Sequence, residues 1–161
     1  MGANAGGSGT GLAGRRVLLC VTGGIAAYKA VELARRLGDA GAEVQVAMTE
    51  AATRFVGAQT FQAVTHRPVR TSLWDASAEA AMGHLELARW AQQVVVAPAM
   101  NHRMWLHSAT QANVDVLRER GALVIGPDDG PLAEGESGPG RLSEPGAIVA
   151  ALAAGTAGYG A

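Results

Sequence analysis

VVVAPAMN, residues 94–101, is the stretch that decides how the fold of this chain is read. Three successive valines without polar alternation favour a strand that is covered on both faces, as in a parallel β-sheet. Pro98 cannot extend the ladder of hydrogen bonds, so we expect the chain to leave the sheet there. Ligands of open α/β sheets bind at the carboxyl ends of the strands, which makes Ala99, Met100 and Asn101 candidate site residues. A turn followed by a helix cap would account for the same residues.

The composition limits the class of protein. A chain of 161 residues fits one domain with a core of its own. Its 13 basic and 14 acidic residues leave a formal net charge of -1, which provides no field for a polyanion, so we expect no nucleic-acid binding. No apolar run approaches the roughly 20 residues that span a bilayer, so no membrane contact is expected.

The single cysteine and the two ends add further expectations. Cys20 lies within the apolar run 17–21, where it is expected to pack as a small hydrophobic residue, and its inability to form an internal disulfide predicts a cytoplasmic protein. Residues 1–14 are predicted to be a disordered leader, residues 15–152 the folded domain, and residues 153–161 a disordered tail. The acidic residues of segment 128–141 are not at metal-ligand spacing, so no metal site is predicted.

The first third of the chain is typical of one βαβ unit. Residues 17–21 and 44–48 are predicted strands, and a helix with apolar positions every three or four residues lies between them. The glycines of the turn at 22–26 let the backbone approach a ligand, and the helix that follows favours a phosphate. The Gly-Gly spacing is not that of dinucleotide folds, so a mononucleotide phosphate is favoured. A tight turn that needs small residues for packing is the alternative.

Three further segments carry candidate groups. Thr49 ends the second strand and is a potential helix cap. His84 precedes a helical segment in which Leu85 and Ala88 are expected to face inward, and this histidine is either a base or a cap. Segment 128–141 is expected to be a flexible loop long enough to form a lid, with Arg141 able to bind a phosphate or carboxylate.

Taken together, the motifs resemble the flavin-dependent cysteine decarboxylases, and among them the phosphopantothenoylcysteine decarboxylases of coenzyme A biosynthesis. The resemblance runs from Arg15 to about Leu152. It is carried by VTGGIAAYKAVELARRL at 21–37, MTEAATRFV at 48–56, TFQAVT at 60–65, LWD at 73–75, MGHLELARWA at 82–91, APAMNHRMW at 97–105, ATQANVDVLRERG at 109–121 and GESGPGRLSEP at 135–145.

The resemblance implies a Rossmann-like α/β fold, a parallel sheet with helices on both faces, and FMN as cofactor. The residues that it implies for the FMN phosphate are Thr22, Gly23, Gly24, Ile25 and Ala26, with help from Thr49. It also implies that Met100 lies near the flavin, that Asn101 binds the substrate carboxylate beside Ala99 and Arg141, and that His84 is catalytic.

The resemblance also implies a reaction and partners. The reaction converts 4'-phosphopantothenoylcysteine to 4'-phosphopantetheine by oxidising the thiol-bearing carbon, releasing carbon dioxide and returning the hydride. Members of this family are trimers or dodecamers, so a homo-oligomer is expected. The ligase that is often fused to this domain in bacteria is not found in this sequence, so a separate phosphopantothenate-cysteine ligase is a possible partner.

The sequence departs from the family pattern in two places. Glu134 stands where the family has a loop cysteine that donates a proton in the last step. Glu134 is then either a substitute proton donor, or the reaction stops at an enethiol, as in the related peptidyl-cysteine decarboxylases, or it is a surface acid on a mobile loop. The family also has two strands that end in Ala-Pro-Ala, whereas residues 97–99 are the one such triplet here. A central strand and its crossover are therefore expected to be missing, and a flavin-free relic or binding module is the rival reading.

Overall fold

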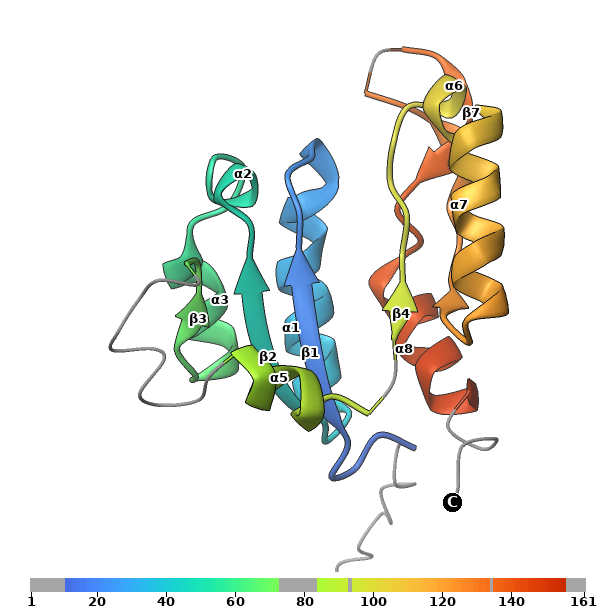
Figure 1. The fold of residues 1–161 in the computed structure, drawn as a ribbon. Helices are drawn as coiled ribbons and strands as arrows, with labels where there is room; N and C mark the ends of the chain where they lie inside the picture. The colour runs from blue at the N-terminus through green and yellow to red at the C-terminus, as the bar shows by residue number, and fades with distance from the viewer. Residues whose placement is uncertain (1–10, 73–83, 93, 134, 156–161) are drawn as a thin grey trace, which may run out of the picture.

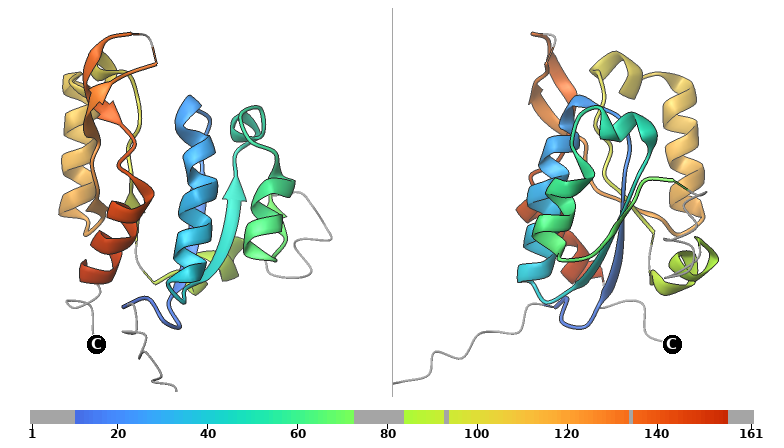
Figure 2. Two further views of the ribbon diagram at one scale, coloured as in Figure 1. Left: turned by 180° about the vertical axis from the view of Figure 1, so that it is seen from behind. Right: turned by 90° about the vertical axis from the view of Figure 1, so that its left-hand side faces the viewer.

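The computed structural model of the chain describes residues 11–72, 84–92, 94–133 and 135–155 (Figure 1). It has the predicted α/β architecture, with parallel strands and helices on both faces of the sheets (Figure 2). The strands are β1 (Arg16–Val21), β2 (Glu43–Met48), β3 (Val69–Arg70), β4 (Val95–Val96), β5 (Leu123–Val124), β6 (Asp128–Pro131) and β7 (Ser137–Arg141). The helices are η1 (Ile25–Tyr28), α1 (Lys29–Asp39), α2 (Glu50–Thr53), α3 (Ala58–Thr65), α5 (His84–Trp90), α6 (His102–Trp105), α7 (Ser108–Glu119) and α8 (Pro145–Gly155).

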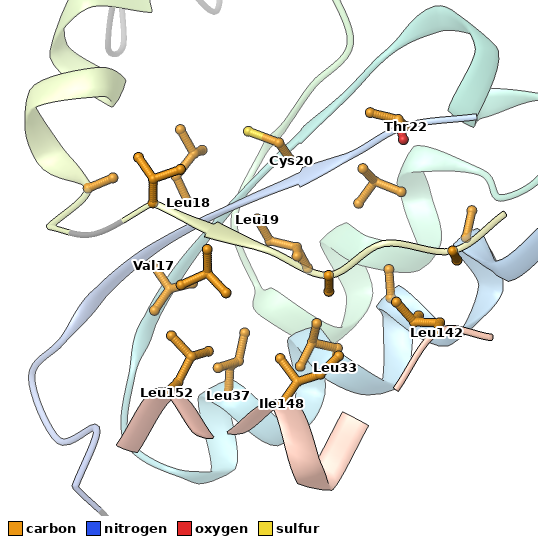
Figure 3. A pocket seen from close by; sticks show the side chains of 18 of the residues that line it. Val17, Leu18, Leu19, Cys20, Thr22, Leu33, Leu37, Leu142, Ile148 and Leu152 are labelled. Carbon is orange, nitrogen blue, oxygen red and sulfur yellow. The ribbon is translucent and has the colours of Figure 1, made fainter. Parts of the chain in front are cut away.

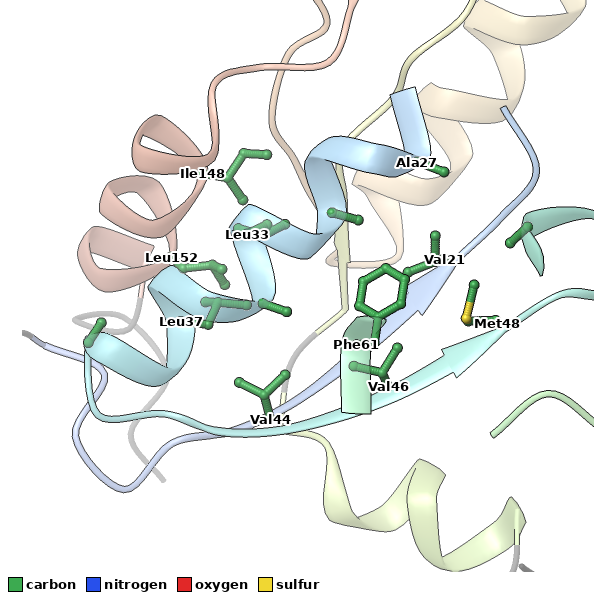
Figure 4. Close-up of a cluster of buried hydrophobic side chains, with 14 of the residues drawn as sticks. Val21, Ala27, Leu33, Leu37, Val44, Val46, Met48, Phe61, Ile148 and Leu152 are labelled. Atoms are coloured by element: carbon green, nitrogen blue, oxygen red, sulfur yellow. The ribbon is translucent and has the colours of Figure 1, made fainter. Parts of the chain in front are cut away.

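The first half of the molecule is a parallel sheet with the strand order β1-β2-β3. β1 and β2 pair residue for residue over their whole length. Val44, Val46 and Met48 alternate with less buried residues along β2 and point into the core, where they meet α1 and α3 (Figure 4). The alternation of apolar residues that predicts this strand from the sequence therefore matches the alternation of buried side chains in the structure.

The second half contains a parallel pair, β4 and β5, and an antiparallel hairpin, β6 and β7. The hairpin corrects the prediction of a flexible loop over residues 128–141, because its backbone pairs across the two strands and Gly140 is buried. Glycine and proline obscured the strand pattern in this segment, since both are depleted in ordinary strands.

The sheet is not continuous. Among the described residues, β1 pairs only with β2, and β4 pairs only with β5. The two halves are joined instead by the packing of α8 on α1, through Leu33, Leu37, Ile148 and Leu152 in a shared core (Figure 4). The sequence predicts that one strand is missing. The sheet does not close across this gap, and the packing of α8 on α1 holds the two halves together instead.

The ordered chain extends past both predicted boundaries. Leu12 is 1% exposed and belongs to the core, so the predicted leader of residues 1–14 is ordered at least from residue 11. α8 continues to Gly155, although the predicted domain ends at residue 152. Residues 1–10 and 156–161 lie outside the described residues.

Two local expectations are wrong. Leu87 is the buried leucine of α5, at 8% exposed, whereas Leu85, which we expected to face inward, is 62% exposed. The sequence also favours one helix from Thr49 through Phe55, Phe61 and Val64, but the structure divides this segment between α2 and α3, with Phe61 fully buried and Phe55 half exposed. Both differences arise because a short apolar segment fits more than one helical phase, and the neighbouring elements select one. No helix in the described ranges combines the length and apolar character needed to cross a membrane.

Candidate functional site

The turn after β1 is the first part of the candidate site. Gly24 is extended, with φ 171°, and a Cβ built on it meets no atom within 4 Å. Gly23 is different, because its Cβ would lie 2.6 Å from the Cβ of Ala51. The need for a small residue in packing therefore holds for Gly23, whereas the space beside Gly24 is open. The chain continues directly into η1 and α1. The Ala27 N–H donates to the Gly24 carbonyl and the Lys29 N–H to the Ala26 carbonyl, so the N–H groups of Ile25 and Ala26 are the leading ones of this helical stretch, where an anion is favoured.

Thr49 lies at the end of β2, beside this turn. Its backbone N–H donates to the carbonyl of Val21, and its hydroxyl oxygen accepts a hydrogen bond from the Ala52 N–H at 3.2 Å. Thr49 is therefore the N-cap of α2, as its position predicts. The hydroxyl hydrogen is still able to donate to a phosphate.

The segment after β4 is fixed by the β6–β7 hairpin. The Met100 N–H donates to the Gly140 carbonyl at 2.9 Å. A Cβ on Gly140 would collide with the Met100 carbonyl oxygen, so only glycine permits this approach. Sequence reasoning missed Gly140 as a site residue, although its place in the glycine-rich hairpin is a usable signal.

Asn101 has both ends of its side-chain amide engaged. Its Oδ1 accepts from the Arg103 N–H at 2.8 Å, which makes it the N-cap of α6. Its Nδ2 donates to Oε2 of Glu136, across the hairpin, at 3.3 Å. The helix cap and the ligand-site reading of Asn101 therefore do not exclude each other, because the cap uses the oxygen and leaves the nitrogen to bind an acceptor.

Glu136 gathers further groups around Asn101. His102 Nδ1 is buried and lies 3.1 Å from Glu136 Oε2, outside hydrogen-bond geometry, and Arg103 Nη2 lies 3.6 Å from Oε1. His102 is thus half-buried against the hairpin, although the sequence around it predicts an ordinary surface or capping histidine. Glu136 was not among the residues expected from the sequence, since nothing local indicated that it would meet residues about 35 positions away.

Arg141 is directed elsewhere. Its guanidinium lies 3.2 Å from Oε1 of Glu144, and the same oxygen accepts from Lys29 Nζ at 2.9 Å. The hydrogen bond from Lys29 is the main reason that the pKa of Glu144 is lowered. These contacts join α1 to the segment before α8. Arg141 therefore has a structural ion pair here, and its binding of a phosphate or carboxylate stays a prediction.

The side chains of His84 and Glu134, the two remaining catalytic candidates, lie outside the part of the chain that the structure describes. His84 is the first residue of α5, but its side chain lies outside the described part of the structure. Glu134, between the two strands of the hairpin, also lies outside the described residues. Their roles stay predictions. No group of three or more potential metal ligands occurs in the described ranges.

A cleft of about 530 Å³ separates β1 from β4 (Figure 3). Leu33, Leu37, Ile148 and Leu152 line it on the side of α1 and α8. The residues that line it at the carboxyl ends of the strands are Thr22, Gly23, Gly24, Ala26 and Ala99. The cleft therefore brings together candidates that are far apart in the sequence. Ile25, Thr49, Met100, Asn101 and Arg141 are not part of its lining.

Cys20 also lines the cleft and corrects an expectation. It is exposed rather than packed as a small hydrophobic residue. β1 directs Val17, Leu19 and Val21 toward the core, so Cys20 points to the opposite face. Partial burial of its thiol among apolar neighbours nevertheless raises its pKa.

The comparisons with known proteins establish the family. The Flavoprotein family model matches residues 8–99 and 92–156, and the chain belongs to this family. It is 45% identical over 171 aligned residues to the coenzyme A biosynthesis bifunctional protein CoaBC of Escherichia coli, an alignment that covers 86% of this chain and 42% of that protein. It is 39% identical to the protein of the same name from Mycolicibacterium smegmatis, over 81% of this chain and 39% of that protein. The chain thus spans less than half the length of these relatives.

Two solved structures share the fold. A PPC decarboxylase variant complexed with pantothenoylaminoethenethiol superposes with a TM-score of 0.73, at 24% identity, over 89% of this chain and 99% of that chain. The FMN binding protein AtHal3 also gives 0.73, at 23% identity, over 91% and 99%. These likenesses confirm the Rossmann-like fold class.

The same comparisons define what the chain lacks. Residues 92–99 fall in both matched ranges, so this one stretch answers to two places in the family model. The alignment with the E. coli relative has 171 positions but covers only 86% of 161 residues, so roughly 30 of its positions have no counterpart here. That length suits one strand with its crossover helix. The predicted loss of a strand and crossover is thereby supported, and the cleft lies where the sheet is interrupted.

Proposed function

We propose that this chain is an FMN-dependent carboxy-lyase that converts 4'-phosphopantothenoylcysteine to 4'-phosphopantetheine in coenzyme A biosynthesis. Membership of the flavoprotein family and 45% identity to a coenzyme A biosynthesis protein support this function. The single observation that carries it is the contact of Asn101 with a carboxylate. Asn101 Nδ2 donates to Glu136, which stands in for the substrate carboxylate, at the carboxyl end of β4 where substrates bind in this class of fold.

The residues around the first turn fit a flavin phosphate. Gly24 has open space beside its backbone, and the helix from Ile25 and Ala26 offers N–H groups to an anion. Thr22 and Thr49 add hydroxyl donors, and Gly23 keeps the turn close to α2. Met100 is proposed to lie against the ring system. When bound, FMN supplies the hydride-accepting chemistry that makes the thiol-bearing carbon an electron sink for loss of carbon dioxide.

The protein side chains are proposed to bind substrate and to move protons. Asn101 holds the departing carboxylate beside Ala99, and Arg141 exchanges its Glu144 partner for an anionic group of the substrate. His84 acts as the catalytic histidine. Glu134 donates the proton that completes the final reduction, in place of the family's cysteine. A carboxyl group does so only when its pKa is raised by burial, because a glutamate with a pKa of about 4.3 is ionised at neutral pH.

Two observations favour other outcomes. The glutamate at position 134 favours a chain that stops at the enethiol, as an oxidative decarboxylase of a peptidyl cysteine does. The interrupted sheet favours a flavin-free relic or binding module, because a strand and its crossover are absent between β1 and β4.

Exposed apolar residues support a homo-oligomer. Ile25, in the proposed phosphate turn, is 66% exposed, and Tyr28, at the end of η1, is 61% exposed. Residues of this kind are suited to cover a flavin from a neighbouring subunit. We therefore propose a trimer or a dodecamer with the site at a subunit contact. A separate phosphopantothenate-cysteine ligase is the proposed source of substrate, and the cytoplasmic location stays a prediction.

Purification of the chain tests the proposal. We expect a yellow protein with flavin absorbance, or a colourless one that takes up added FMN. Protein that stays colourless with FMN would exclude both enzyme readings. If flavin binds, the mass of the product separates 4'-phosphopantetheine from the enethiol, which is lighter by two hydrogens. His84→Asn is expected to abolish carbon dioxide release. His66→Asn is the matched control, because asparagine tolerates the left-handed φ of 56° at position 66.

A further inference from the structure

The edge of β1 that faces the cleft has backbone groups directed away from β2. Glu43 N–H donates to the Arg15 carbonyl, and Thr49 N–H donates to the Val21 carbonyl, so the odd-numbered residues of this strand face β2. Backbone polar groups alternate in direction along a strand, so those of Leu18 and Cys20 face the cleft. The Arg16 N–H, which donates to Gln92 Oε1 at 3.3 Å, follows the same alternation.

The edge of β4 is the counterpart of the β1 edge. Leu123 N–H donates to the Val94 carbonyl and Ile125 N–H donates to the Val96 carbonyl, so the even-numbered residues of β4 face β5. The backbone groups of Val95 therefore face the cleft. Figure 1 shows that the arrows of β1 and β4 point the same way. The cleft is thus bordered by two parallel strand edges, each a template for one more strand.

The size and lining of the cleft suit a short apolar strand. Spacings of about 4.8 Å between strands, about 10 Å between layers and about 3.3 Å per residue give roughly 160 Å³ for one residue of a covered strand. A cleft of about 530 Å³ then holds about three residues. Most side chains that border it are leucine, isoleucine, valine or alanine (Figure 3). Its polar residues lie toward the ends of β1, with Arg15, Arg16 and Gln92 at the amino end and Thr22 at the carboxyl end, and Cys20 lies near the carboxyl end.

The match to the family model indicates what kind of segment belongs there. Residues 92–99, QQVVVAPA, match two places in the family model, although they fill only one strand of this structure. A second segment with the same character, uncharged and rich in β-branched residues, is therefore what the two edges and the apolar lining accommodate.

We propose that the cleft between β1 and β4 binds an extended apolar segment of another polypeptide, which adds as a parallel strand to both edges. This strand addition would make one continuous sheet from β3 to β5. The proposal does not depend on flavin binding or on decarboxylation, because it rests on the two strand edges and the apolar lining.

A peptide with the sequence of residues 92–99, extended by two lysines for solubility, is the probe. We expect it to bind the full chain with one-to-one stoichiometry and to slow amide hydrogen exchange at Leu18 and Cys20 at least about tenfold. Alkylation of the Cys20 thiol by iodoacetamide is expected to slow at the same peptide concentration. The matched control peptide has proline in place of the residue 95 valine and is expected to have no effect, because proline lacks an N–H and interrupts the ladder.

A variant of the protein gives an independent control. Cys20→Pro removes an N–H that faces the cleft and leaves the β1–β2 bonds of the odd-numbered residues, so we expect a folded chain that no longer binds the peptide. If this variant fails to fold, the exchange data with the two peptides still decide. Equal effects of both peptides, or protection at β3 in place of β1, would overturn the proposal. Slower amide exchange at Leu18 and Cys20 with FMN and no peptide would also overturn it. So would slow exchange at these amides without peptide in a chain that has the mass of a dimer, because a second copy would then occupy the cleft.

Discussion

Replacing Gly140 by alanine tests the contact that holds the β6–β7 hairpin on the segment after β4. The new Cβ would collide with the Met100 carbonyl oxygen, so the hairpin must move away from it. That movement breaks the hydrogen bond from the Met100 N–H, which contributes about 1 kcal/mol, and adds overpacking of about 1–3 kcal/mol. We therefore expect Gly140→Ala to lower the free energy of unfolding by about 2–4 kcal/mol.

Chemical denaturation followed by circular dichroism measures this loss, and hydrogen exchange at the Met100 amide shows whether it is local. Gly24→Ala is the matched control, because its Cβ meets nothing within 4 Å and its backbone is extended. We expect that control to be unchanged or stabilised by up to about 1 kcal/mol. If Gly140→Ala unfolds at the same midpoint as the unsubstituted chain, the packing of the hairpin on Met100 does not exist in solution.

The remaining predictions concern the ligand site and the response to pH. Gly24→Ala is expected to weaken FMN binding by about 10- to 100-fold, because the new Cβ occupies the open space beside the backbone and displaces the phosphate from one or two charge-assisted hydrogen bonds. Equal affinity of the variant and the unsubstituted chain in a titration would assign the turn to packing alone. Asn101→Asp in a Glu136→Gln background keeps the cap of α6 but places a carboxylate at the substrate site, so we expect a folded protein without decarboxylase activity, and retained activity would remove Asn101 from carboxylate binding. The pKa of Glu32 is lowered to about 2 by hydrogen bonds from Arg35 and Arg36, so its contribution to stability is present above the ordinary value of 4.5 and is lost as the pH falls toward 2. Glu32→Gln is therefore expected to melt at a lower temperature than the unsubstituted chain at pH 7 and at the same temperature near pH 2, and an equal difference at both pH values would contradict this assignment.

The closest agreement between sequence and structure lies in the first third of the chain. The strands around residues 17–21 and 44–48, the helix between them and the cap at Thr49 follow from patterns within a few residues of each other. Local signals of this kind depend on the alternation of side chains and on capping, which the sequence records directly. The same holds for the helix cap at Asn101, because a turn and a helix follow the strand that ends before Pro98.

Long-range contacts explain what the sequence did not reveal. Glu136 meets Asn101 only because the hairpin folds back over the end of β4, and Gly140 is needed there because two backbones touch. The choice of Leu87 over Leu85 as the buried residue of α5 depends on which side of the helix meets β1. None of these contacts leaves a periodic signal in its own segment.

VVVAPAMN, residues 94–101, shows where this division lies. The sequence by itself determined that a strand lies here and that one stretch stands where the family has two. The expected cover on both faces is wrong, because Val94 is 65% exposed and β4 contains only the half-buried Val95 and Val96. Only the tertiary structure decided the consequence of that loss for the sheet. Two half-sheets remain apart, with a cleft between β1 and β4, because the packing of α8 on α1 fixes the distance that strand pairing would otherwise set.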